Sequence, residues 1–238
     1  MTGPGYTGRV HVGGPTDVRV LDGAEIRKVA VGPMDNAAYL LTCRRTGAQL
    51  LVDAPAEPDR LLALVREGSS SARLDTVVVT HRHHDHVGAL TSVVAVTGAQ
   101  VAAGADDADA IASATDHAVA VRLRHGDTVT VGDLVLDVVG LRGHTPGSVA
   151  LALSEPSDVR APGAVPGRVH LFTGDSLFPG GVGATGGDAA RFTALLGDVT
   201  TRVFERFRDD TWVYPGHGDD TTLGAERPHL AAWAARGW

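Results

Sequence analysis

Thr80-His81-Arg82-His83-His84-Asp85-His86-Val87-Gly88 is the most informative segment of the sequence. It follows the apolar run Val77-Val78-Val79, which is typical of a short buried strand. Residues 81–86 then carry four imidazoles and one carboxylate, which are the ligands that zinc and similar divalent ions prefer. Packing these groups together without a cation would cost desolvation free energy with little return. The alternative, a solvated loop that happens to be rich in histidine, is disfavoured because His and Asp recur downstream in matching contexts.

Three later segments repeat this context. His144 lies in Gly143-His144-Thr145-Pro146-Gly147-Ser148, Asp175 lies in Thr173-Gly174-Asp175-Ser176, and His217 lies in Pro215-Gly216-His217-Gly218. Each follows a predicted strand and has small neighbours, which let the backbone turn tightly. One such residue alone is a weak signal, because a single buried histidine more often only satisfies hydrogen bonds. Together with the first stretch, the three segments predict one metal site.

The number of candidate ligands indicates how many ions the site holds. There are seven candidates: His81, His83, Asp85, His86, His144, Asp175 and His217. A catalytic zinc takes about three protein side chains, so seven are too many for one ion. Three ligands on each side of one shared carboxylate suit two ions about 3.5–4 Å apart. Asp175 is the candidate for the shared position, because a carboxylate has two oxygens and neutral imidazole offers one free lone pair.

The rest of the chain predicts strand clusters separated by helices, which favours a layered α/β fold. We expect one domain over residues 1–238, with residues 1–17 loosely ordered. The predicted strands are Val18–Val31, Ala37–Cys43, Gln49–Asp53, Leu74–Val79, Gln100–Ala103, Thr128–Val131, Leu134–Leu141, Ser148–Leu153, Val169–Thr173 and Trp212–Tyr214. The predicted helices are Glu57–Glu67, Gly88–Val96, Asp106–Ala114, Arg191–Phe207 and Leu223–Trp233.

Composition excludes several classes of partner. The net charge is −7 and no long basic cluster occurs, so we expect no nucleic-acid partner. No apolar run approaches the roughly 20 residues that a membrane span needs, so we expect no membrane partner. The N-terminal segment has no apolar region of the kind found in secretory signals, so we expect a cytoplasmic protein. The single cysteine, Cys43, excludes an internal disulfide and reads as a packed core thiol.

The ordered set of candidate ligands resembles the metallo-β-lactamase superfamily. Within that superfamily the chain is most similar to the short glyoxalase II-like (hydroxyacylglutathione hydrolase-like) hydrolases. The segments that carry this likeness are Thr173–Phe178, Gly216–Gly218 and Thr222–Arg227. The resemblance implies an αββα sandwich, in which two mixed β-sheets are flanked by helices and the metals lie at one edge. It also implies that His81, His83 and His144 hold one metal, that Asp85, His86 and His217 hold the other, and that Asp175 lies between them.

The resemblance further implies a dinuclear metal-dependent hydrolase that uses a metal-bridging hydroxide as its nucleophile. A thioester is the expected substrate, with another small-molecule ester as the alternative. We expect two divalent ions per chain, with zinc as the metal and iron or manganese as alternatives. Asp85 is the expected catalytic side chain, because it can orient the hydroxide in addition to binding a metal.

Other functions stay open at this stage. One is a persulfide dioxygenase that uses a single iron, held by residues matching His81, His144 and Asp175. Others are a lactonase and a non-catalytic or nucleic-acid-processing member of the superfamily. The acyl group, the carrier thiol and the oligomeric state are not determined. Phe178 and residues 180–187 are either the mouth of the substrate site or a plain surface loop.

Residues outside the motif are assigned supporting or structural roles. Asp53 and Tyr39 are expected to support the site from behind the ligands. His84 occupies a position that the motif leaves free, so we expect it to lie behind the ligands or to be exposed. The remaining histidines are predicted to be structural or on the surface: His11, His117, His125, His170 and His229.

Overall fold

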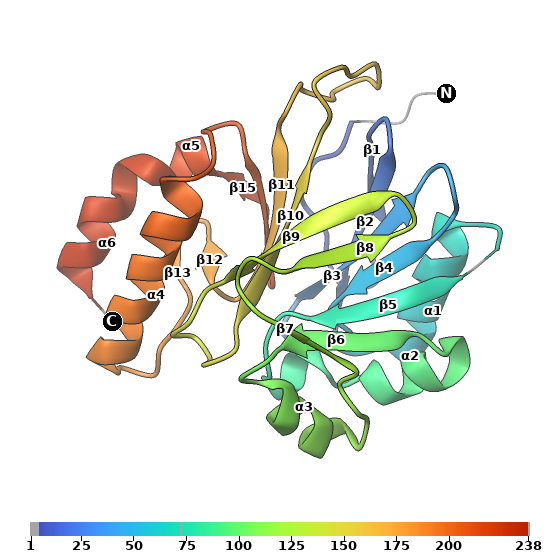
Figure 1. Cartoon of the computed structure of the whole chain (residues 1–238), viewed down its shortest axis with the longest axis horizontal. Coiled ribbons are helices and arrows are strands. Elements are labelled where there is room, and N and C mark those ends of the chain that lie inside the picture. The colour runs from blue at the N-terminus through green and yellow to red at the C-terminus, as the bar shows by residue number, and fades with distance from the viewer. Residues whose placement is uncertain (1–4, 72, 238) are drawn as a thin grey trace.

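Two β-sheets stacked face to face form the centre of the molecule (Figure 1). The computed structural model describes residues 5–71 and 73–237. The first sheet has seven strands in sequence order: β1 (Asp17–Val20), β2 (Ala24–Val31), β3 (Asn36–Cys43), β4 (Gln49–Val52), β5 (Leu74–Val79), β6 (Gln100–Gly104) and β7 (Val121–Leu123). It is a mixed sheet, because β1 to β4 pair antiparallel and β4 to β7 pair parallel.

The second sheet is also mixed. Its strand order is β15 (Thr221–Thr222), β14 (Trp212–Pro215), β11 (Val169–Gly174), β10 (Val149–Ser154), β9 (Leu134–Gly140) and β8 (Thr128–Val131). The pair β11 and β14 is parallel and the other pairs are antiparallel. A short hairpin, β12 (Leu177–Phe178) and β13 (Gly181–Val182), follows β11.

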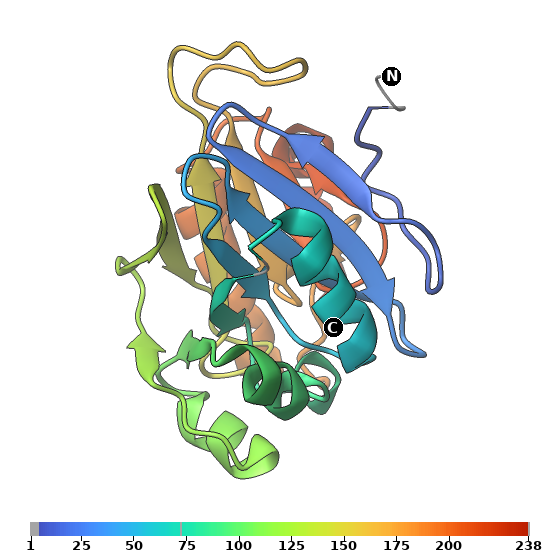
Figure 2. The same ribbon diagram turned by 90° about the vertical axis from the view of Figure 1, so that its right-hand side faces the viewer.

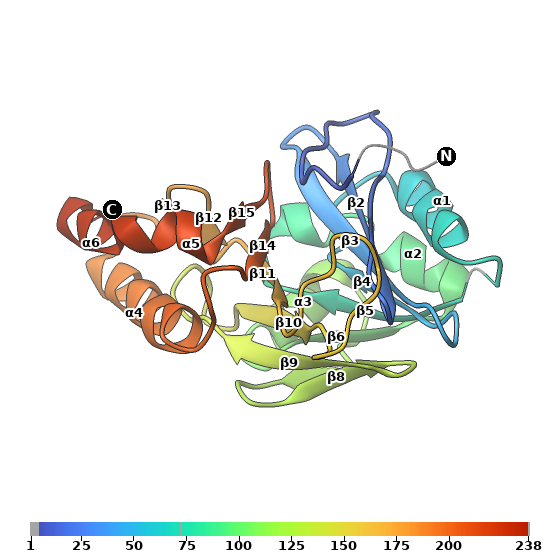
Figure 3. The same ribbon diagram turned by 90° about the horizontal axis from the view of Figure 1, so that it is seen from above.

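Helices cover the outer face of each sheet (Figure 3). The first sheet is covered by α1 (Pro58–Gly68), α2 (Leu90–Thr97) and α3 (Ala108–Thr115). The second is covered by α4 (Ala189–Val199), α5 (Leu223–Glu226) and α6 (Leu230–Arg236). The predicted αββα sandwich with two mixed sheets is therefore confirmed.

Three apolar layers account for this architecture. Between the sheets lie the inward-facing side chains of both, including Leu41, Phe172 and Tyr214, each fully buried. Tyr39, Phe172 and Tyr214 pack ring against ring, with centroids 4.6–5.4 Å apart. Fully burying one large apolar side chain contributes roughly 1.5–3 kcal/mol, so this central layer is a large part of the stability. The other two layers lie between each sheet and its helices.

Several predicted boundaries differ from the structure. The predicted strand Val18–Val31 is two strands, because the chain turns between β1 and β2. The predicted helix Arg191–Phe207 is α4 followed by a π-helical turn at Thr200–Phe204. The closing helix is interrupted by a 3₁₀ turn at Arg227–His229, where Pro228 lacks the N–H that a continuous α-helix needs. The two-residue strands and β7 were not predicted, since such short runs carry little periodicity.

The N-terminal segment and one long connection lie outside these layers. Residues 5–16 form no helix or strand, although Tyr6 packs against Trp212 and Tyr214. Residues 1–4 lie outside the described residues, and the division into one domain with a loose N-terminus stays a prediction. The connection between β10 and β11 projects from the sandwich (Figure 2). Cys43 is a buried free thiol, as predicted. No helix among the described residues has the length and apolarity to cross a membrane.

Candidate metal centre

The candidate ligands come together at one edge of the sandwich. His81 follows the end of β5, His144 follows β9, Asp175 follows β11 and His217 follows β14. The carboxyl ends of β9, β11 and β14 lie at the same edge, because β11 pairs parallel with β14 and β9 is separated from β11 by one antiparallel strand. At this edge the backbone N–H of Val149 donates to the carbonyl of Thr80 at 2.9 Å, which joins the two sheets.

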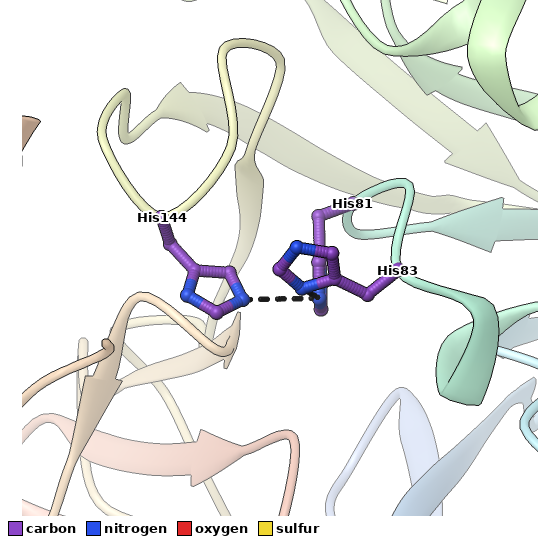
Figure 4. A group of neighbouring side chains, drawn as sticks. All are labelled: His81, His83 and His144. Atoms are coloured by element: carbon purple, nitrogen blue, oxygen red, sulfur yellow. Dashed lines mark hydrogen bonds between the residues drawn. The ribbon is translucent and has the colours of Figure 1, made fainter. Parts of the chain in front are cut away.

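Three histidines form the first ligand group (Figure 4). The Nε2 atom of His81 lies 3.1 Å from Nδ1 of His83 and 3.2 Å from Nε2 of His144. Two nitrogens bound to one tetrahedral zinc at 2.0–2.1 Å lie about 3.3–3.4 Å apart, so these separations match a common ion. His81 and His144 are buried, whereas His83 is half-buried.

Asp85, His86 and His217 form the second ligand group. Nε2 of His217 lies 3.3 Å from Nε2 of His86 and 3.4 Å from Oδ2 of Asp85. Asp85 and His86 belong to the 3₁₀ turn at His84–His86. The ring of His86 lies 4.1 Å from the ring of His81, so the two groups adjoin, and His81, His86 and Asp175 form a third set that could hold an ion. His84 points to solvent, with 92% of its side chain exposed, which agrees with the predicted exposed position.

Asp175 lies between the two groups. Its Oδ1 is 3.3 Å from Nε2 of His86, and its Oδ2 is 3.4 Å from Nε2 of His217 and 3.6 Å from Nε2 of His144. Oδ1 is buried and accepts no hydrogen bond within the described part of the chain. A buried carboxylate oxygen without a donor is costly unless a cation contacts it, so the donor set fits divalent ions.

Hydrogen bonds fix which ring nitrogen faces the centre. Nδ1–H of His144 donates to the carbonyl of Ala184 at 2.7 Å, and Nδ1–H of His217 donates to the carbonyl of Met34 at 2.9 Å. Nδ1–H of His86 donates to Oδ2 of Asp53 at 2.9 Å. In each ring the proton on Nδ1 leaves the lone pair of Nε2 directed at the centre, which is the arrangement that metal-binding histidines need.

The two groups differ in their protonation. Burial lowers the pKa of His81, His83 and His144, so these rings are neutral at pH 7. Burial alone would also lower the pKa of His86, but the carboxylates of Asp53 and Asp175 outweigh it and raise that pKa to about 10. In the absence of ions, a proton on His86 therefore supplies part of the positive charge that the neighbouring carboxylates require.

The carboxylates at the centre are ionised. Burial by itself would raise the pKa of Asp175, yet His217 and His86 lower it below its usual range. Burial also opposes ionisation of Asp85, but the hydrogen bond from Asn36 and the charge of His86, together with a backbone hydrogen bond, lower the pKa of that carboxyl. Two ionised carboxylates and a set of neutral imidazoles are suited to binding cations.

Supporting side chains surround the ligands. Asp53 lies behind the ligands, where it accepts hydrogen bonds from His86, from the hydroxyl of Thr80 at 2.8 Å and from the N–H of Thr80 at 2.7 Å. Tyr39 donates its hydroxyl to the carbonyl of Pro215 at 2.6 Å, next to the loop that carries His217. Gly216 is required at its position, since a Cβ there would collide with Oδ1 of Asp175.

Sequence reasoning missed three supporting residues. Nδ2 of Asn36 donates to the carbonyl of Asp85 at 2.9 Å and to its Oδ2 at 3.0 Å. Arg191 donates to the carbonyls of Gly143 and His144, and Asp107 accepts from the same loop. Asn36 begins a strand, and the other two lie in predicted helices, so no local pattern distinguished them from ordinary polar positions.

A cavity of about 570 Å³ borders the centre. Phe178 and residues 179–184 line it, together with Arg236 and Gly237. The ring of Phe178 lies 6.3 Å from the ring of His217, and Ala184 is the hydrogen-bond partner of His144. None of the candidate ligands is among the residues that line the cavity, so the mouth of a substrate site and a plain surface loop both stay predictions for this segment.

Known proteins show the same combination of sequence and fold. The family model of the metallo-beta-lactamase superfamily matches residues 31–218. The hydroxyacylglutathione hydrolase of Fuscovulum blasticum is 38% identical over 149 residues, which cover 63% of this chain and 51% of that protein. The chain spans about half to two thirds of the length of the first curated relatives that it matches.

Solved structures agree with the family model. ETHE1 from Myxococcus xanthus is 30% identical, with a TM-score of 0.70, and the match covers 88% of this chain and 84% of that one. TTHA1623, solved in a di-iron-bound form, is 32% identical, with a TM-score of 0.63, and the match covers 84% of this chain and 96% of that one. The shared fold, the extent of the family match and the ligand-rich edge together show that this chain belongs to the metallo-β-lactamase superfamily.

Proposed function

We propose that this chain is a dinuclear metal-dependent hydrolase that acts on a thioester. The observation that carries the proposal is the position of Asp175, which contacts both ligand groups: its Oδ1 lies 3.3 Å from Nε2 of His86, and its Oδ2 lies 3.4 Å from Nε2 of His217 and 3.6 Å from Nε2 of His144. Its Oδ1 is also buried without a hydrogen bond. One ion in each group, with Asp175 between them, would give every candidate ligand a partner. TTHA1623 was solved in a di-iron-bound form, which supports two ions per chain. For this chain we propose zinc, because imidazole and carboxylate are ligands that zinc prefers.

The chain's own residues would have separate tasks. His81, His83 and His144 would hold the first ion, and Asp85, His86 and His217 would hold the second. When bound, two such ions supply a hydroxide nucleophile near neutral pH and stabilise developing negative charge on the substrate. Asp85 is half-buried and ionised, so its carboxylate could also accept a hydrogen bond from the attacking water and orient it.

The thioester substrate is proposed from the relatives and from the cavity. Several curated relatives are named hydroxyacylglutathione hydrolase, and a hydroxyacylglutathione is a thioester. The cavity beside Phe178 could bind the acyl or thiol portion next to the ions. Lactones and other small esters are the alternative substrates of the same chemistry. We further propose that the protein is cytoplasmic and has no membrane partner. The net charge of −7 supports the absence of a nucleic-acid partner.

Metal analysis combined with a thioester panel tests the proposal. The purified chain is expected to contain two divalent ions, to lose turnover when a chelator removes them, and to recover it when zinc is restored. Thiol release is followed with glutathione, coenzyme A and simple alkyl thioesters. A chain that binds two ions but releases no thiol from any of them would contradict the substrate class, whereas a chain that binds no ion would contradict the whole proposal.

A persulfide dioxygenase with a single iron is the second candidate. The specific observation that favours it is that Nε2 of His144 lies 3.2 Å from His81 and 3.6 Å from Asp175, so these three residues could also hold one ion. The likeness to ETHE1 is compatible with this alternative. One iron per chain with oxygen uptake in the presence of a persulfide would support the dioxygenase, and two ions with thiol release would support the hydrolase.

A further inference from the structure

Asp107 is a fully buried carboxylate that contacts both loops of the first ligand group. It follows β6 and directly precedes α3. Its Oδ2 accepts from the N–H of Arg82 at 3.1 Å and from the hydroxyl of Thr145. Its Oδ1 accepts from the N–H of Gly147 at 3.0 Å. Arg82 lies between His81 and His83, and Thr145 follows His144, so one side chain joins the segments that carry all three histidines.

The direction of this side chain is unusual for its place in the sequence. An aspartate just before a helix commonly accepts a hydrogen bond from the first turn of that helix. Asp107 makes no such bond to α3, and its carboxylate turns toward the two loops instead. All its donors therefore come from outside its own helix, and they lie 25 to 40 residues away along the chain.

The surrounding backbone is shaped for this contact. A Cβ on Gly147 would collide with the backbone N and the side chain of Asp107, so only glycine permits the approach. The hydroxyl of Thr145 donates to Asp107 and in turn accepts from Ser148, with 2.7 Å between the two oxygens. Thr145 and Ser148 are both buried, so this chain of hydrogen bonds is shielded from water and rigid.

We propose that Asp107 is a positioning residue that sets the distance between the His81–His83 loop and the His144 loop, and so determines the affinity of the first ion. This inference rests on the proposed function, because it assumes that the first ligand group binds a metal. Three donors converge on one carboxylate, and no neutral side chain of the same shape can accept from all of them. Asp107→Asn would leave at least one donor facing an amide NH₂, which pushes the loops apart.

Cobalt uptake by the ion-free protein tests this inference. Co²⁺ is titrated into the wild-type chain and Asp107→Asn, with binding followed by visible absorption and by metal analysis after dialysis. His83→Ala and His217→Ala supply the reference spectra for loss of the first and the second ion. Mutation of the residues that hold metal ligands typically lowers metal affinity by about 10–100-fold. We expect a loss of this size in the affinity for the first ion and a change of less than about threefold in the affinity for the second.

Glu155→Gln is the matched control. Glu155 is also a buried carboxylate with several donors, namely Arg168, His170 and the N–H of Val165, but it lies at the far end of β10. This variant is expected to lose stability and to keep wild-type Co²⁺ uptake. If Asp107→Asn lowers the affinity for both ions equally, or for neither ion, the inference is wrong. If the wild-type chain binds no Co²⁺, the proposed function fails instead.

A second pair of variants covers the case in which Asp107→Asn does not fold. Thr145→Val removes the hydroxyl that donates to Asp107 and keeps the side-chain shape, whereas Thr145→Ser keeps the donor. We expect Thr145→Val to weaken the first ion by several-fold and Thr145→Ser to retain more of that affinity than Thr145→Val does. Equal affinities in the two variants would overturn the inference.

Discussion

The two ligand groups use the same edge of the sandwich but differ in charge. The first consists of three imidazoles whose pKa values are lowered by burial, whereas the second contains the carboxylate of Asp85 and His86, whose pKa is raised to about 10. The first group is neutral and ready for a cation at pH 7. The second group must release protons when an ion binds, so the two groups can differ in their affinity for an ion even though both bring three side chains together.

The groups also differ in how they are supported. His86 is held by Asp53, which directly follows β4 of the first sheet. The first group depends on Asp107, which reaches across from β6 to loops of both sheets. Both groups take ligands from both sheets, because His144 follows β9 and His217 follows β14. They differ in their support: Asp53 holds His86 from the first sheet, whereas Asp107 joins loops that follow strands of both sheets.

Removing Asp175, the carboxylate proposed to lie between two ions, is expected to have the largest effect. Asp175→Ala deletes the oxygens that face both groups, so both ions weaken and turnover of the thioester falls by about 10³-fold or more. Metal analysis and thiol release measure the outcome. Asp133→Ala, in an exposed hairpin turn, is the control and is expected to behave like the wild-type chain. Retention of two ions by Asp175→Ala would remove the basis for a shared ligand.

Single-ligand variants separate the two groups. His83→Ala is expected to lose the first ion and His217→Ala the second, each with turnover lower by about 10²–10³-fold, because each leaves its ion with too few protein ligands. A ratio of about one metal ion per chain in both variants would support the assignment of His83 and His217 to different ions. A ratio of two together with full activity in His83→Ala would refute its assignment.

Asp53→Asn should affect the second group more than the first. The asparagine amide has only one oxygen that can accept a hydrogen bond, so either Nδ1–H of His86 or the N–H of Thr80 loses its acceptor. We expect the second ion to weaken by about 10–100-fold. This result would mirror that of Asp107→Asn on the first ion. Equal weakening of both ions in a Co²⁺ titration would contradict separate support of the two groups.

Asn36→Ala is expected to have the smallest effect. It removes two hydrogen bonds to Asp85 but leaves every candidate ligand in place. We expect the second ion to weaken by about 3–10-fold, and the free energy of unfolding to fall by about 1–2 kcal/mol, as for loss of a partly buried hydrogen-bond partner. Equilibrium dialysis and urea denaturation measure the two quantities, and no change in either would show that Asn36 does not hold Asp85.

Prediction from sequence succeeded where the signal was local. The ligand types cluster at residues 81–86, and β5, β8 and β14 have clear apolar or β-branched runs, so these features were predicted with little or no shift in boundaries. Helix ends were less accurate, because Pro228 and the π-helical turn after α4 interrupt an otherwise continuous apolar period. The grouping of the ligands came from the family resemblance and not from spacing.

The sequence by itself supplied the candidate ligands: seven imidazole and carboxylate side chains in segments that follow strands, marked by short-range patterns of apolar and small residues. The tertiary structure decided which of them face one another, which ring nitrogen is free, and which distant residues hold them. The reason is physical: Asp107 and Asn36 act through hydrogen bonds to residues 25 to 49 positions away. The contacts with Asp85 and Arg82 form only when the strands of the first sheet pair, and those with Thr145 and Gly147 only when the two sheets pack together.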